Sequence, residues 1–441
     1  MRAAQKKARV EKAVAAEARA GRALAKQIHE FAEPAFKEHR SAEVLAEYLG
    51  THGFEVDFCF KHIPTAFRAV RGKGKPVIGM LGEYDALPNC GAEEGTWGHG
   101  CGHDLLGTAG AVGAVAAAAL LEQLDLRGTV VYYGCPAEET LAGKVYMARD
   151  GAFRDLDFCL AWHPGRRTGA SNAGGSALDS LVYEFFGRTA HGAWAHGGRS
   201  ALDAAVLMDV AANYLREHVE ENVRIHMVFR STGDAPNVVP AYAKSWYYVR
   251  GRDREQVDAV RQRLDLCAEG AALATETEQK SQRLTAVYSR LPNDRFAAGV
   301  LANAKLFGGP RGTAADKRRA AAAGKADATF PRGIDEDLGR QGRGSSDEDN
   351  VSWIAPLGKF TVTCVPNGTM GHHRDQTSQG ALPFAHRGML QAAKIFAGCA
   401  IDLCTDADLR RAIRAEFRKR TRDSTYDPLI PKRQAVPIDP P

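Results

Sequence analysis

The sequence predicts an α/β protein: a main domain with a mixed β-sheet flanked by helices, and an inserted ferredoxin-like domain. The chain has 441 residues, enough for two or three domains. Short β-rich runs alternate with helical segments up to about residue 175, which is typical of a sheet with helices on both faces. Beyond that point the order becomes strand, helix, strand, strand, helix, strand. We therefore expect residues 1–175 and 292–441 to form the main domain, interrupted by residues 176–291.

The elements of the main domain follow from local patterns. Basic side chains in residues 1–22 are interrupted by Glu11 and Glu17, which predicts an ordinary helix rather than a targeting peptide. Apolar spacing in residues 23–50 predicts a second helix that ends at Gly50. Further apolar runs predict strands at 77–81, 128–133, 157–163 and 359–365, and helices at 107–121, 142–150, 296–306 and 382–400.

The inserted domain is predicted in the same way. We expect strands at 178–187, 223–230, 241–250 and 278–288, and helices at 200–219 and 254–271. The basic run at 317–319, back in the main domain, is expected on a solvated loop or helix face. The proline-rich tail, 426–441, is expected to lie extended on the surface.

The composition narrows the class of protein. It is ordinary for a globular protein, with 44% hydrophobic and 25% charged residues, and the net charge of +5 is too small to imply a nucleic-acid partner. No apolar run reaches the roughly 18 residues that span a bilayer, so we expect no membrane partner. The nine cysteines are odd in number and scattered, which argues against a disulfide framework and for a reducing cytoplasm.

A glycine-bracketed thiol and imidazole stand out before the helix predicted at 107–121. Cys101 and His103 lie in the stretch Gly-His-Gly-Cys-Gly-His-Asp, residues 98–104. Glycine lets the backbone turn sharply and approach an ion closely, and Cys and His bind transition metals readily. Two such residues alone do not make a site, so the rest of the chain must supply further ligands and a base.

Further acids and histidines follow other predicted strands. Glu83 and Asp85 come after the first strand, and strand alternation turns both to one side. Glu138 and Glu139 follow the second strand, where one could bind metal and the other move a proton; a plain exposed acidic pair is the alternative. His163 ends the third strand, although a lone His before Pro is more often structural.

Taken together, these residues predict a metal site. His372, beside a glycine near the C-terminus, completes the set. The crevice at the carboxyl ends of strands is where sites form in α/β sheets. The mixed sulfur, nitrogen and oxygen ligands suit Zn, Mn or Co, as one ion or two. The five predicted ligands are Cys101, His103, Glu139, His163 and His372.

The same motifs carry a family resemblance over about residues 25 to 430. The stretches GEYDALP, GHGCGHDLLG, PAEE, WHP, GRTAHGAWAHGGRSALDA and SSDEDNVSW resemble the aminoacylase-type metal-dependent amidohydrolases, within them the p-aminobenzoyl-glutamate hydrolase group. The resemblance implies a catalytic main domain and an inserted lid that also forms the dimer. Glu83 stands where more distant relatives have a metal-binding His.

The resemblance also implies roles for individual residues. The five ligands above would hold the metal, Glu138 would be the general base, and Asp85 would orient a metal-bound His. The lid residues His191, His226 and Asn237 would reach the substrate, often across a dimer, and Arg374 or a lid His would hold its carboxylate. The cofactor would be one or two Mn or Zn ions, and the protein a homodimer or larger homo-oligomer.

These inferences predict a cytoplasmic hydrolase of a non-peptide C–N bond in a small aromatic or N-acyl amino carboxylate. Amide cleavage, as in aminobenzoyl-glutamate, is the leading form. The alternative is hydrolytic removal of an aromatic amino group, as in 5-nitroanthranilic acid aminohydrolase, which resembles this branch and serves aromatic compound degradation by deamination. An inactive relative that works as a binding module and an aminopeptidase are further interpretations.

Overall fold

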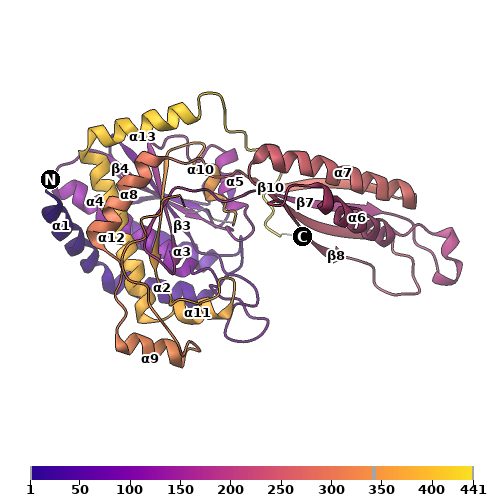
Figure 1. Ribbon diagram of the computed structural model, residues 1–441, viewed down its shortest axis with the longest axis horizontal. Helices are drawn as coiled ribbons and strands as arrows, with labels where there is room; N and C mark the ends of the chain where they lie inside the picture. Colours follow the sequence, from indigo (N-terminus) through magenta and orange to yellow (C-terminus); the bar gives the residue numbers. More distant parts are fainter. Residues whose placement is uncertain (1, 340–343, 440–441) are drawn as a thin grey trace. The chain divides into compact units, whose positions relative to one another are not determined.

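The computed structural model describes residues 2–339 and 344–439, and the chain divides into two compact units. Unit 1 comprises the described residues of 1–174, 291–341 and 350–427, and unit 2 comprises those of 175–290, 342–349 and 428–441. The tail from residue 428 therefore groups with unit 2, whereas the sequence assigned it to the main domain. Figure 1 colours the chain from indigo at the N-terminus to yellow at the C-terminus.

Unit 1 is built on a seven-stranded sheet with the order β1-β2-β4-β3-β5-β11-β6. Strands β4, β3, β5 and β11 are parallel neighbours at its centre, and the pairs at both edges are antiparallel. The carboxyl ends of the central strands therefore meet at one edge of the sheet. The strands are β1 (Glu55–Phe58), β2 (Phe67–Lys73), β3 (Val77–Glu83), β4 (Gly128–Cys135), β5 (Phe158–Gly165), β6 (Gly169–Ser171) and β11 (Leu357–Thr363).

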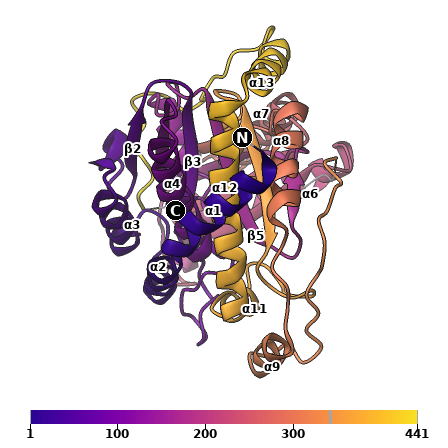
Figure 2. The same ribbon diagram turned by 90° about the vertical axis from the view of Figure 1, so that its left-hand side faces the viewer.

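Helices cover this sheet in layers. Helices α4 and α12 lie against each other and contact the sheet, and α1 crosses both of them (Figure 2). The helices of unit 1 are α1 (Ala3–Ala16), α2 (Ala18–Phe31), α3 (His39–Thr51), α4 (His103–Gln123), α5 (Gly143–Arg149), α8 (Asp294–Phe307), α9 (Ala314–Ala322), α11 (Arg374–Gly380), α12 (Pro383–Thr405) and α13 (Ala407–Arg420), with a short 3₁₀ turn, η1 (Phe60–His62). The short α10 (Glu348–Val351) spans the boundary between the units.

Helix α4 is the central helix of unit 1. Its glycine- and alanine-rich sequence lets neighbours approach closely: a Cβ at Gly113 would meet Phe396 of α12 at 2.7 Å. Among the described helices only α4 is long and apolar enough to cross a membrane, and 94% of its most apolar window is buried inside the protein. Core helices of globular domains share both properties, and the buried helix predicted from the sequence is confirmed.

Unit 2 contains a four-stranded antiparallel sheet with the order β10-β7-β9-β8. Helices α6 and α7 pack on one face around buried residues such as Tyr183, Met208 and Leu264. Strand β8 forms an edge. The elements are β7 (Ala177–Phe186), η2 (Gly192–Gly197), α6 (Ala201–Leu215), η3 (Arg216–His218), β8 (Arg224–Ser231), β9 (Tyr242–Gly251), α7 (Arg254–Thr275) and β10 (Glu278–Val287). This is the βαββαβ order that the sequence predicts.

The structure differs from the prediction at several helices and edge strands. The helix expected over 23–50 is two helices, because Ala32 is left-handed (φ 44°) and Pro34 cannot continue the backbone bonding. The second of these helices ends at Thr51 rather than at Gly50. Helix α13 and the edge strands β1, β2 and β6 were not expected; β1 is four residues long and half exposed, so its apolar pattern is faint.

Candidate metal centre

The acids and histidines of interest gather where the central strands of unit 1 end. Glu83 is the last residue of β3, and Glu138 and Glu139 follow β4. His163 lies just before the end of β5, and His103 begins α4. Because β3, β4 and β5 are parallel neighbours, these side chains meet at the carboxyl edge of the sheet.

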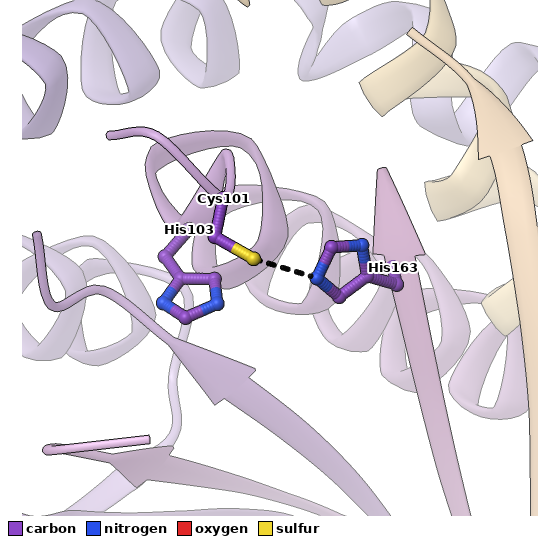
Figure 3. A group of neighbouring side chains, drawn as sticks. All are labelled: Cys101, His103 and His163. Atoms are coloured by element: carbon purple, nitrogen blue, oxygen red, sulfur yellow. Dashed lines mark hydrogen bonds between the residues drawn. The ribbon is translucent and has the colours of Figure 1, made fainter. Parts of the chain in front are cut away.

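Glycines bring the start of α4 close to its neighbours. Gly102 has a left-handed φ of 77°, and a Cβ there would meet the Pro164 ring at 2.8 Å. A Cβ at Gly100 would lie 2.6 Å from the Cys90 sulfur. With this close approach, Cys101 Sγ lies 3.2 Å from His163 Nε2, and the two side chains point toward each other (Figure 3). A side chain in either glycine position would clash with these neighbours and displace the turn that carries Cys101.

His103 is held by a buried carboxylate. Its Nδ1 lies 2.8 Å from Asp85 Oδ1, and neither side chain is exposed. The other Asp85 oxygen accepts a hydrogen bond from the backbone N–H of Glu139, also at 2.8 Å. Asp85 therefore ties α4 to the turn after β4. With Nδ1 engaged, His103 Nε2 is the nitrogen that faces the centre, 4.0 Å from the carboxylates of both Glu138 and Glu139.

His372 joins the centre from a distant loop. Its backbone is left-handed (φ 53°), a conformation that is costly for a residue with a side chain. Its N–H donates to the carbonyl of Gly100 at 2.8 Å, which holds this loop against the turn before Cys101. The His372 Nε2 then lies 3.5 Å from Glu139 Oε2, with 63% of the side chain exposed.

Among the described residues, three overlapping sets of side chains could hold a metal ion, with ligand atoms within 4.8 Å of one another in each. They are Cys101, His103 and His163; Cys101, Glu139 and His372; and Glu83, His103 and Glu138. The first two sets share the Cys101 sulfur and together contain all five predicted ligands. The structure therefore brings these five residues together with Asp85 and Glu138.

Burial and charge set the protonation of the centre. Burial, with the nearby Glu139 carboxylate, raises the pKa of Cys101 to about 12. Burial raises the pKa of Glu139 to about 7; His103 opposes this and Asp85 adds to it. Burial lowers the pKa of His103, but Asp85 outweighs it and the pKa lies well above its usual value. The centre thus carries protons that a cation would displace.

Two buried polar atoms at the centre indicate that its residues fit a metal ion. His103 Nε2 and Glu139 Oε1 are buried without a hydrogen-bond partner among the described residues. An unsatisfied polar atom is costly in a protein interior, and a bound cation would compensate both of these atoms. Both atoms belong to residues of the sets described above, and thiol, imidazole and carboxylate are the donors that zinc and manganese accept. The residues fit a divalent cation.

Sequence reasoning missed three residues around the centre. Lys144, fully buried in α5, pairs with Glu83 at 2.7 Å. Glu38 is also fully buried and accepts hydrogen bonds from the backbone of Ala137, directly before Glu138, and from Thr65. Glu83 was noticed as a carboxylate at a strand end, but no role at the centre was assigned to it. A lysine inside the apolar stretch of α5 was the available signal for the first; an isolated Glu before α3 offered none for the second.

The predicted substrate residues of unit 2 form two groups. His191 and Asn237 lie on adjoining loops, where Gly192 N–H donates to the Asn237 carbonyl at 2.7 Å. His226 lies on the edge strand β8, where it is exposed to solvent. Partial burial of its ring, together with the nearby Arg250, lowers its pKa. In unit 1, Arg374 begins α11 two residues after His372, with an exposed side chain. These four residues therefore come from three separate parts of the fold.

An α/β fold with thiol, imidazole and carboxylate ligands at its strand ends is typical of metal-dependent hydrolases. Comparison with known proteins gives the family. The model of peptidase family M20/M25/M40 matches residues 79–266. One of the two subunit types of the p-aminobenzoyl-glutamate hydrolase of Escherichia coli is 36% identical, over 93% of this chain and 94% of that protein. The chain belongs to peptidase family M20/M25/M40, and it is an enzyme that hydrolyses amide bonds.

Two further relatives extend the comparison. The Xaa-Arg dipeptidase of Mus musculus is 28% identical, over 90% of this chain and 88% of that protein. The crystal structure of the Bacillus subtilis YXEP protein, described as a dinuclear metal-binding peptidase of family M20, aligns with a TM-score of 0.58 at 20% identity. It covers 88% of this chain and 99% of that chain. This second likeness supports the fold.

Proposed function

We propose that the protein hydrolyses the amide bond that joins an aromatic or acyl group to a small amino carboxylate. The observation that carries the proposal is the pair of ligand sets that share Cys101, with the carboxylate of Glu138 beside them. We further propose that Cys101, His103, Glu139, His163 and His372 hold one or two Mn or Zn ions. Bound there, a divalent cation would polarise the substrate carbonyl and acidify water.

Glu138 is proposed as the group that moves the proton. Its carboxylate lies 4.0 Å from His103 Nε2 with 12% of the side chain exposed, so it borders the ligand sets and remains open to water. It would accept a proton from the attacking water and return it to the leaving nitrogen. Its neighbour Glu139 is buried and faces His372, so the two adjacent acids would serve different purposes.

Asp85 is proposed to position His103. A carboxylate on one imidazole nitrogen selects the tautomer that leaves the other nitrogen available as a ligand. Because Asp85 also holds the Glu139 backbone, one side chain would orient two of the ligands. The buried Glu38 carboxylate supports the same turn through Ala137, whose backbone is left-handed (φ 56°).

The substrate class is proposed from the relatives and from the charged groups of this chain. One relative is named for aminobenzoyl-glutamate and another for a dipeptide, and both compounds carry a free carboxylate. Arg374, close to His372 in the chain, is the proposed partner of that carboxylate. His191, His226 and Asn237 are proposed to reach the substrate, from the same chain or from a second copy.

A homodimer is proposed from the surface of unit 2. Val206, Val210 and Tyr214 lie four residues apart on α6 and are 43%, 44% and 75% exposed. The edge strand β8 offers unpaired backbone groups of the kind that join sheets between protomers. We also propose a cytoplasmic location, because none of the nine cysteines, which all lie among the described residues, forms a disulfide.

The test is a substrate panel assayed for two products. Purified protein loaded with Mn or Zn should release glutamate from p-aminobenzoyl-glutamate, and Glu138→Gln should lower that rate by about 10²–10⁴-fold while the metal content stays unchanged. Aminoaromatic acids such as 5-nitroanthranilate are tested beside it. Ammonia from these compounds, with no amino acid released from any amide or dipeptide, would refute amide hydrolysis.

A further inference from the structure

Lys144 is an unusual cation in the core of unit 1. It is the second residue of helix α5 and its side chain has no exposed surface. A positive charge near a helix N-terminus opposes the helix dipole, and a buried ammonium is costly unless it is paired. Its Nζ lies 2.7 Å from Glu83 Oε1, and 4% of the Glu83 side chain is exposed. The ion pair is therefore closed off from water beside the metal centre.

Glu83 belongs to one of two ligand sets that share His103, so a metal bound with Glu83 would compete with a metal bound with Cys101 and His163. Its Oε2 is 3.4 Å from His103 Nε2, the nitrogen left available by Asp85. His103 belongs to two of the three ligand sets, one with Cys101 and His163 and the other with Glu83 and Glu138. Because one nitrogen binds one ion, a cation at His103 can occupy only one of these two sets at a time.

We propose that the Lys144 ammonium is a built-in cation that occupies the Glu83 side of the centre and directs a divalent ion at His103 to Cys101 and His163. This inference rests on the proposed metal centre. The ammonium neutralises Glu83 and repels a dication from that oxygen. Glu83 thus serves as the partner of an internal cation. Lys144 is a positioning residue that acts on the metal through Glu83.

The experiment uses cobalt(II) chloride and the full-length protein freed of metal. Cobalt bound to a thiolate gives a charge-transfer absorbance that oxygen and nitrogen ligands do not. The variant Lys144→Gln removes the charge and leaves a neutral polar side chain that is one bond shorter. It is expected to bind cobalt at the Glu83 set about tenfold more tightly or better. Absorbance per bound cobalt, with bound metal counted by dialysis, should therefore fall below that of the wild type.

Two matched variants isolate the charge. Lys6→Gln removes a lysine that pairs with Asp402 at 2.7 Å, with 13% of the Lys6 side chain exposed, and it should leave the absorbance unchanged. Glu83→Gln combined with Lys144→Gln removes the competing ligand and should restore the wild-type absorbance per cobalt. If Lys144→Gln does not fold without metal, cobalt should restore its melting transition, because the dication replaces the ammonium beside Glu83.

The outcomes separate this inference from the proposed function. Wild-type protein that binds no cobalt, or binds it without the thiolate absorbance, contradicts the metal centre itself. A second result is that the wild type shows the thiolate absorbance while a folded Lys144→Gln variant shows the same absorbance and the same number of bound cobalt ions. That result would overturn only the role of Lys144. Failure of cobalt to rescue an unfolded Lys144→Gln would overturn it as well.

Discussion

Replacing Asp85 with Asn tests the structure of the centre directly. The Asp85 carboxylate accepts two hydrogen bonds, one from His103 Nδ1–H and one from the backbone N–H of Glu139, both at 2.8 Å. Asparagine is nearly the same shape but has one acceptor oxygen and an amide that donates. Whichever way the amide is turned, one of the two buried donors must face another donor.

The size of the effect follows from these two contacts. A buried donor without an acceptor costs about 1–3 kcal/mol of unfolding free energy. Losing the carboxylate that orients a metal-bound His typically costs about 10- to 100-fold in metal affinity, or about 1.4–2.7 kcal/mol. We therefore expect Asp85→Asn to fold with a lower melting temperature and to bind zinc about 10- to 100-fold more weakly.

The assay is competition for zinc with a chromophoric chelator, combined with urea unfolding of the metal-free protein. Asp104→Asn is the matched control, because Asp104 is equally buried and holds His29 Nδ1 at the same distance of 2.8 Å, but His29 is not a ligand candidate. This control should lose stability and keep its zinc affinity. Zinc affinity of Asp85→Asn within about twofold of the wild type would refute the positioning role.

Three further predictions concern protons, stability and assembly. Because the pKa of Cys101 is raised to about 12, its thiol is protonated at neutral pH and must lose a proton to bind zinc. Zinc affinity measured by titration calorimetry should therefore rise by at least about tenfold per pH unit there, and an affinity that does not change with pH would exclude thiolate binding. Burial raises the pKa of Asp104, but nearby His99 and His29 outweigh it and bring the pKa to about 2, below the unfolded value; Asp104→Asn should cost about 2–3 kcal/mol in urea unfolding at neutral pH, and this cost should fade as the pH drops from about 4 toward about 2. Val210→Glu, on the exposed face of α6, should halve the mass measured by light scattering, and an unchanged mass would contradict the proposed dimer face.

Most strands and helices could be predicted from the sequence, because each is marked by an apolar pattern within its own short stretch of residues. Each such pattern can be recognised within about ten to twenty residues. Examples are the apolar runs of β3, β4 and β5 and the glycine- and alanine-rich sequence of α4. The breaks in the pattern were harder to place. A single left-handed residue, Ala32, and Pro34 divide one long apolar periodicity into α2 and α3, and the periodicity itself continues across them.

The sequence by itself determined which side chains could bind a metal and that most of them lie at the strand ends. Thiol, imidazole and carboxylate side chains after successive strands of a parallel sheet must converge, because such strands end at one edge. Only the tertiary structure decided how these groups pair. Lys144 and Glu83 are 61 positions apart, and His372 meets Glu139 through a loop held by the Gly100 carbonyl. Periodicity reports which side of an element is buried; which buried charge faces which depends on packing between elements that no local pattern records.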